Sequence, residues 1–326
     1  MKLYKVFSIF KKLKKLRVES SISTKELKKI YNLPTFKKVD LLPFVADDYY
    51  KINPFFVDDK SGYIRFTSES YTGKTDFFGR MKRRESFNEI LNGIYKFEIK
   101  DSIVEYEELF PVSKVPNFED PRVIDFYNRK IIYLTEVKNV NENSWDFNVS
   151  FFDLNSMEKI EIENLGLNKN YIAKVESRWL TFITSTMPEV RFSYNLDLKM
   201  VENKKESYSI ERSFNGGSNF FMVNLNDYRV VRKRYLSKKH GAFHLNYILR
   251  YKDNSINAVS RPFYFKEKNL EVCNSVLVSL SEINFYVTIN DLDSYRFSCD
   301  INDFESFFNE NIDFYTTSLG EIDEDE

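Results

Sequence analysis

The feature that most constrains this chain is a recurring pattern in which a polar, loop-like element precedes strand-like segments. Beyond about residue 45, apolar and polar residues alternate in short runs such as SGYIRFTSES, RKIIYLTEV and FHLNYILRYK, and such runs predict half-buried strands. The polar elements are INPFF at 52, FEDPR at 118, NKNY at 168, NGGSN at 215 and EVCNS at 271. After the first, they lie roughly fifty residues apart, a spacing typical of four-stranded propeller blades.

Five such units predict an all-β fold, a five-bladed β-propeller with a short N-terminal helical extension. Because the innermost strands of a propeller gather around one axis, we expect the polar elements to meet at one end of the central channel. A β-sandwich also contains many short strands, but it gives no reason for one polar element in each unit. We expect residues 1–44 to form a basic helical extension, 45–316 the propeller, and 317–326 an acidic, disordered tail.

The composition agrees with a β-rich protein and excludes some functions. Aromatic residues make up 17% of the 326 residues, and aromatic side chains favour strands. The net charge of −1 creates no global field toward nucleic acid, so we expect no nucleic-acid partner. The two cysteines and two histidines lack the spacing of zinc ligands. We expect no disulfide framework and no metal site, and we identify no cofactor.

The first 18 residues combine apolar and basic side chains. Leu3, Val6, Phe7, Phe10 and Leu13 fall on one side of a helix. Such a helix could touch an anionic membrane surface, or it could dock on its own domain. No run approaches the roughly 18 apolar residues of a transmembrane helix. We therefore expect a cytoplasmic protein, with peripheral contact to the inner membrane face through residues 1–18 as one alternative; the oligomeric state is left open.

Two charged stretches each allow a structural and a functional interpretation. In FEDPR, the residues Glu119, Asp120 and Arg122 surround a proline, which fits either an ordinary turn or a catalytic acid. The basic run RVVRKRYLSKKH, from 229 to 240, could be a solvated hairpin or could hold a phosphorylated donor such as a nucleotide sugar.

Several of these elements together resemble one known family. FEDPRV resembles the Glu-Asp-Pro-Arg signature of the five-bladed propeller enzymes that phosphorolyse or hydrolyse β-mannosides, glycoside hydrolase family 130. The stretch that begins NKNYIAKVESRW is similar to that family's Lys-Asn-aromatic element, and NGGSNFFMVNL is similar to its Gly-Gly-Ser/Thr element. AVSRPFYF is similar to a blade-closing segment of relatives in surface-polysaccharide clusters. The resemblance covers roughly residues 45 to 316.

The resemblance implies an inverting mechanism with Asp120 as general acid or base. The carboxyl protonates the glycosidic oxygen while phosphate or water attacks the anomeric carbon from the other face. The implied partner is a sugar or sugar phosphate, and the implied binding residues are Asn53, Glu119, Arg122, Lys169, Asn170, Gly217, Ser218 and Asp291. Lys169, Asn170 and Asp291 fit simple turns equally well.

The chain also departs from the family. The phosphorylases carry an arginine at the end of the first innermost strand, where this chain reads FTSES, and a histidine where this chain has Asn224. We therefore favour glycosyl transfer or phosphorolysis in bacterial surface-polysaccharide metabolism. The alternatives are a non-catalytic glycan-binding propeller accessory to a polysaccharide synthase, and a glycoside hydrolase with Glu176 as a further carboxylate.

Overall fold

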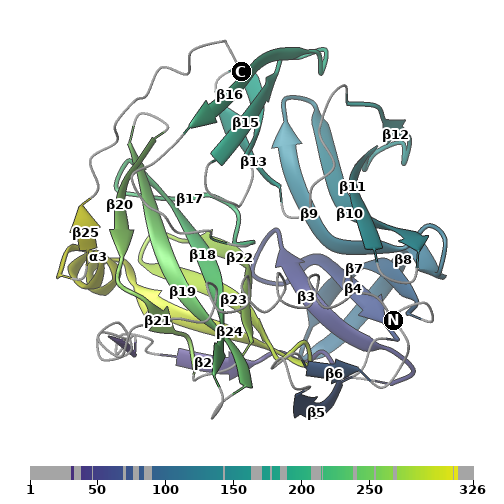
Figure 1. Ribbon diagram of the computed structural model, residues 1–326, viewed down its shortest axis with the longest axis horizontal. Helices are drawn as coiled ribbons and strands as arrows, with labels where there is room; N and C mark the ends of the chain where they lie inside the picture. The colour runs from purple at the N-terminus through teal and green to yellow at the C-terminus, as the bar shows by residue number, and fades with distance from the viewer. Residues whose placement is uncertain are drawn as a thin grey trace, which may run out of the picture.

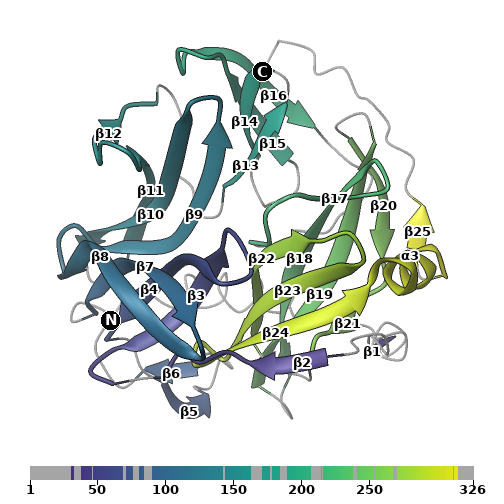
Figure 2. The same cartoon turned by 180° about the vertical axis from the view of Figure 1, so that it is seen from behind.

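The chain forms a five-bladed β-propeller, as the sequence predicts. The computed structural model describes residues 31–32, 38–45, 47–68, 71–75, 81–83, 90–141, 144–162, 171–176, 178–183, 189–206, 214, 216–237, 241–252, 255–266, 270–310 and 312–314. Five sheets surround one axis, and Figures 1 and 2 show the innermost strands around the centre of the molecule. The helix and the membrane contact expected in residues 1–18, and the tail 317–326, lie outside the described residues.

The blades follow one another along the chain. Blade I contains β3 (Tyr50–Phe56), β4 (Ser61–Thr67), β7 (Asn92–Lys100) and β8 (Ile103–Ser113). Blade II contains β9 (Phe118–Phe126), β10 (Arg129–Asn141), β11 (Ser144–Asp153) and β12 (Lys159–Ile160). Blade III contains β13 (Ile172–Glu176), β14 (Trp179–Ile183), β15 (Glu189–Tyr194) and β16 (Met200–Glu206). A separate two-stranded sheet joins β5 (Tyr71–Thr75) to β6 (Met81–Arg83).

The last two blades are built differently from the first three. Blade IV contains β17 (Phe221–Val223), β18 (Asn226–Ser237), β19 (Gly241–Lys252), β20 (Ser255–Ser260) and β21 (Phe263–Tyr264), with β1 (Tyr31–Asn32) and β25 (Ile312–Phe314). Blade V contains β22 (Glu271–Val278), β23 (Glu282–Ile289), β24 (Asp293–Asp300) and β2 (Lys38–Leu41). Because β2 pairs with β24, a strand that precedes blade I in the chain closes the ring. The strands of blade V therefore include residues as early as Lys38.

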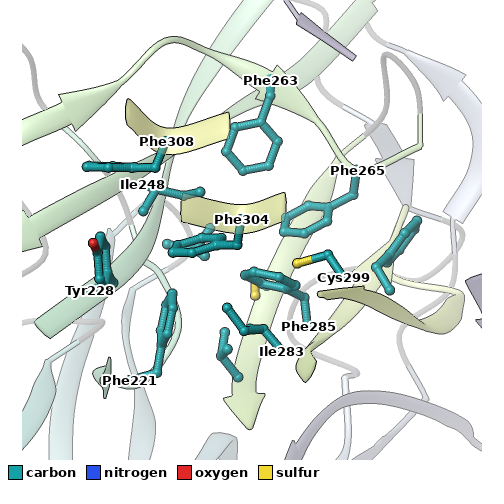
Figure 3. Packing of buried hydrophobic residues seen from close by; sticks show 14 of the residues in the cluster. Phe221, Tyr228, Ile248, Phe263, Phe265, Ile283, Phe285, Cys299, Phe304 and Phe308 are labelled. Atoms are coloured by element: carbon teal, nitrogen blue, oxygen red, sulfur yellow. The ribbon is translucent and has the colours of Figure 1, made fainter. Parts of the chain in front are cut away.

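A helix that the sequence did not predict covers blades IV and V. α3 (Ile301–Glu310) follows β24 directly and places Phe304, Phe307 and Phe308 on one side, the spacing of a buried helix face. The Phe304 ring lies 5.2 Å from that of Tyr228 and 5.9 Å from that of Phe221, measured between centroids (Figure 3). This aromatic cluster joins two blades into one core.

The innermost strands bulge near the axis. INPFF, FEDPR and EVCNS lie inside β3, β9 and β22 and are not loops, which corrects the expectation from the sequence. Pairing skips Asn53 and Pro54 in β3 and skips Asp120 and Pro121 in β9. Asn53 and Asp120 have φ of 53° and 50°, a region that Asn and Asp enter more readily than most residues. Since proline has no N–H, each bulge leaves one donor fewer to satisfy.

Candidate functional site

The bulges of blades I and II bring a carboxylate and an amide together at the axis. Asn53 Nδ2 donates a hydrogen bond of 2.8 Å to Asp120 Oδ1. Asn53 is itself fixed, because its backbone N–H donates to Thr288 Oγ1 of blade V at 3.2 Å. Asn53 Oδ1 is buried and accepts no hydrogen bond from the described residues. Asp120 is half-buried, and one of its carboxylate oxygens is held in place by Asn53.

Arg122 extends the site from blade II to blade IV. The Arg122 side chain is 8% exposed, and its Nη2 donates to the carbonyl oxygen of Gly217 at 2.7 Å. Its Nη1 is buried and has no hydrogen-bond partner among the described residues. Gly217 has a φ of 146°, and a Cβ there would lie 2.3 Å from the Val230 carbonyl oxygen. Only glycine therefore lets this backbone, whose carbonyl oxygen accepts from Arg122, pass so close to β18.

Arg232 of β18 adds a second cation near the carboxylate. Burial lowers the pKa of Arg232, the negative charges of Asp120 and Asp291 oppose that shift, and the charge of Arg122 adds to it. A Cβ on Gly216 would lie 2.8 Å from three atoms of the Arg232 guanidinium, so the guanidinium passes directly over this glycine. Arg232 keeps part of its surface exposed to solvent. Two arginines and two carboxylates thus share the axial region.

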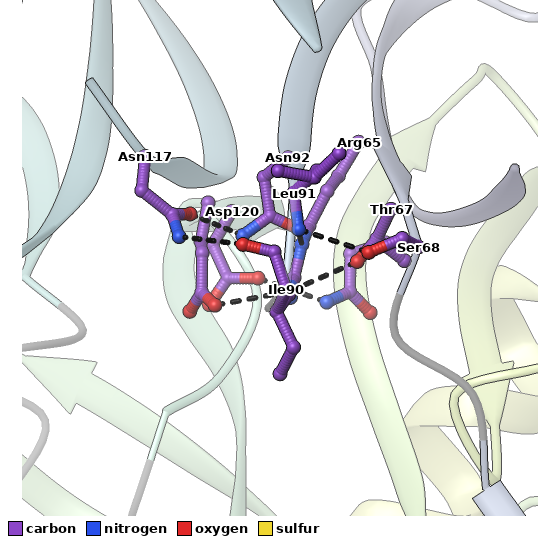
Figure 4. A network of polar contacts seen from close by, with 10 residues as sticks. Arg65, Thr67, Ser68, Ile90, Leu91, Asn92, Asn117 and Asp120 are labelled. Carbon is purple, nitrogen blue, oxygen red and sulfur yellow. Dashed lines mark hydrogen bonds and ion pairs between the residues drawn. The ribbon is translucent and has the colours of Figure 1, made fainter. Parts of the chain in front are cut away.

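A buried polar network lies behind Asp120. Arg65 Nη2 is 3.0 Å from Glu119 Oε1, and Arg65 Nε donates to Asn92 Oδ1 at 2.8 Å. Asn92 Nδ2 donates to Asn117 Oδ1, and Asn117 Nδ2 donates to the Ile90 carbonyl oxygen at 3.3 Å. Figure 4 shows Arg65, Asn92 and Asn117 with Asp120 beside them. The network joins blade I to the start of β9.

The structure brings together five of the residues singled out from the sequence, namely Asn53, Glu119, Asp120, Arg122 and Gly217. Ser218 is fully buried, and its hydroxyl bonds to backbone groups of Asn219 and Val230. Asp291 lies with Asn290 in the turn between β23 and β24, where both have positive φ. Lys169 and Asn170 lie outside the described residues.

Arg232 is the site residue that sequence reasoning missed. The basic run from 229 to 240 allows a solvated hairpin or a phosphate site, and its charges alone do not say which side chain faces the axis. In the structure, Arg229 is fully buried and Arg232 faces the axis. The sequence signal for these inward orientations is that the two arginines flank the apolar pair Val230 and Val231.

His244, one of the two histidines of the sequence, lies buried in β19. Its Nδ1 is 2.8 Å from the Glu271 carbonyl oxygen. Burial holds the pKa of His244 well below its usual range, and the positive charges of Arg232 and Arg234 add to that effect. The imidazole is therefore neutral at pH 7 and adds no positive charge to the axial region.

The lining at the other end of the axis is mixed, with apolar side chains beside Asp125, Lys174 and Asp227. A cavity of about 440 Å³ is lined there by the later residues of the innermost strands, among them Phe55, Ile124, Val175, Phe220 and Leu277. Lys174 at its edge is paired with Glu176 at 2.7 Å and with Asp227 at 2.8 Å. Glu176, the candidate further carboxylate, is thus an ion-pair partner at this end.

The described residues contain no group of three His, Cys, Asp or Glu side chains suited to a metal ion. Among the same residues, no helix has the length and hydropathy needed to cross a membrane.

Comparison with known proteins supports the fold. No family model and no curated protein matches the sequence. A GDP-mannose-dependent mannosyltransferase from Leishmania mexicana has a similar structure, with a TM-score of 0.59 and 10% identity over 85% of this chain and 92% of that protein. A β-1,2-mannobiose phosphorylase from Listeria innocua gives 0.54 and 10% over 85% and 95%. A mannose phosphorylase from Leishmania mexicana, in complex with phosphate, gives 0.54 and 13% over 96% and 100%.

Proposed function

We propose that this protein is a carbohydrate-active enzyme that makes or breaks a glycosidic bond with inversion, with Asp120 as general acid or base. The observation that carries the proposal is the setting of Asp120. One carboxylate oxygen accepts from Asn53, and no described residue forms an ion pair with the carboxylate. A carboxyl oriented in this way can exchange a proton with a glycosidic oxygen.

The two arginines support an anionic reaction partner. Arg122 Nη1 is a buried donor with no described partner, and Arg232 is partly exposed over Gly216. Guanidinium groups bind phosphate oxygens through paired hydrogen bonds. Phosphate as nucleophile, or a sugar phosphate or nucleotide sugar as donor, would bring such oxygens to the axis. Two of the similar structures are phosphorylases and one is a GDP-mannose-dependent transferase, which suggests the first compounds to test.

Hydrolysis is the weaker alternative, because an inverting hydrolase needs a second carboxylate to activate water. Glu119 is paired with Arg65, and Glu176 is paired with Lys174. Asp291, which interacts electrostatically with Arg232, is the candidate base. We place the reaction in bacterial surface-polysaccharide metabolism in the cytoplasm.

A glycan-binding propeller without activity is the other alternative. Such a protein would bind its glycan equally well after the Asp120 carboxylate is replaced by an amide.

The test is the variant Asp120→Asn, assayed with β-1,2-mannobiose plus phosphate and with GDP-mannose plus mannose. We expect wild-type turnover on at least one pair and a loss of about a hundredfold or more in kcat for the variant, since general acid catalysis contributes that much. Asp125→Asn is the matched control, because Asp125 lies on the same strand but is exposed. Full activity of Asp120→Asn would disprove the assignment.

A further inference from the structure

A buried ion pair adjoins the proposed acid. Glu119 directly precedes Asp120 in β9, and its Oε1 lies 3.0 Å from Arg65 Nη2 of β4. The two side chains are 8% and 5% exposed. The pair therefore crosses from blade I to the strand that carries Asp120, and both charges sit where water screens them little.

The surrounding amides fix this pair on both sides. Asn92 of β7 accepts from Arg65 Nε and donates to Asn117, which lies just before β9. The start of β9 is thereby held at Asn117 and again at Glu119, immediately before the bulge that presents Asp120. Such an anchor fixes the geometry of the bulge. It also fixes the separation between the carboxyl groups of Glu119 and Asp120.

The electrostatic consequence follows from the order of the charges. A bare Glu119 carboxylate would repel the ionised form of Asp120 and favour its protonation, whereas a bare Arg65 would have the opposite effect. As a pair, the two charges largely cancel. Arg232 of β18 interacts electrostatically with Asp120, with Arg122 of β9 and with Asp291 of the β23–β24 turn, and none of these groups is altered when the pair is changed.

We propose that Arg65 and Glu119 are positioning residues: either charge left alone would shift the protonation of Asp120, their pairing prevents that shift, and Glu119 acts through this pair and not by contacting the sugar. The catalytic consequence rests on the proposed function, but the effect on the Asp120 carboxyl does not. The interpretation replaces the sugar contact that the family resemblance implied for Glu119.

The direct test measures the titration of Asp120 in the full-length protein. Aspartate carboxyl carbons are labelled with ¹³C, and the Asp120 signal is assigned by its loss in Asp120→Asn. We expect Arg65→Gln to raise the apparent pKa of Asp120 by about one unit and Glu119→Gln to lower it by about one unit. The double variant should titrate like the wild type. Shifts of the same sign, or no shift in either single variant, would overturn the proposal.

Arg65→Lys and the double variant keep the test valid if a single variant unfolds, because breaking one partner of a buried pair is strongly destabilising. Arg65→Lys keeps the charge, and the double variant Arg65→Gln with Glu119→Gln removes both charges. Both should leave the pKa of Asp120 close to that of the wild type, and a change of a full unit in either would contradict the proposal. Thermal melting reports folding for each protein.

Kinetics then separate positioning from sugar binding. For a positioning residue, Glu119→Gln shifts the pH dependence of kcat and leaves KM unchanged. For a residue that contacts the sugar, KM rises while the pH dependence stays the same, and that result would refute the proposal. Since the ¹³C titration needs no substrate, a failure of the proposed function, seen as full activity of Asp120→Asn, is distinguishable from a failure of this inference.

Discussion

At the scale of residues, Asn53 and Asp120 occupy matching places in two blades. Each sits in a bulge with positive φ, and each precedes a proline. The two side chains meet in a hydrogen bond of 2.8 Å. Blade I thus supplies an amide where blade II supplies the carboxylate. This difference keeps a single negative charge at the contact, because two carboxylates so close together could not both ionise.

The variant Asn53→Asp tests this reasoning. Two carboxyl groups at hydrogen-bond distance share a proton, so the apparent pKa of the pair rises above that of a lone aspartate. If Asp120 works as an acid, the pH optimum of the reaction shifts upward. The pH–rate profile measures this shift. Asn128→Asp adds the same charge at an exposed turn and should leave the profile unchanged; an unaltered profile in Asn53→Asp would contradict the contact.

At the scale of elements, the glycines before β17 control how blade IV approaches the axis. A Cβ on Gly217 would meet the backbone oxygen of Val230, whereas a Cβ on Gly216 would meet the far end of the Arg232 side chain. A backbone neighbour cannot move without shifting a strand, but a flexible side chain can. The two glycines therefore have different consequences when they are replaced.

Alanine substitutions should separate stability from binding. Gly217→Ala is expected to lower the free energy of unfolding by about 3 kcal/mol, since its φ of 146° suits only glycine. Gly216→Ala, with a φ of 57°, should lower it by only about 1 kcal/mol. It should nevertheless weaken phosphate binding, because Arg232 must move. Urea unfolding and calorimetric titration with phosphate measure the two effects, and equal effects of both variants on stability would count against this account.

The sequence predicted the elements better than their conformation. The alternation of apolar residues and the spacing of the polar elements are local properties, so the strands and the five units could be predicted. The bulges at Asn53 and Asp120 could not, because Asn-Pro and Asp-Pro are equally typical of turns. The inward direction of Arg232 depends on the register of β18 against β19, which no local pattern in the basic run fixes.

At the scale of the whole molecule, the propeller is closed by β2, a four-residue strand that precedes blade I in the chain. β2 adds the outer strand to blade V, and Asp40 on β2 accepts hydrogen bonds from Arg296 of β24 at 2.5 and 3.2 Å. Lys38 also lies 3.2 Å from Asp40. Any weakening of this contact affects the ring as a whole, because strands from the two ends of the propeller meet there.

The variant Asp40→Asn tests the closure through its pH dependence. The hydrogen bond from Arg296 lowers the pKa of Asp40 in the folded protein, while partial burial opposes it. A pKa that is lower in the folded protein stabilises the fold at pH values above the unfolded pKa of about 3.9. This stabilisation is lost as the pH falls through the folded pKa. We therefore expect Asp40→Asn to melt at a lower temperature than the wild type at pH 7, and the difference in Tm to shrink toward zero in strong acid. Asp48→Asn, at an exposed position, is the control and should melt with the wild type at both pH values. A difference in Tm for Asp40→Asn that stays constant across this range would show that the closure does not depend on the Asp40 charge.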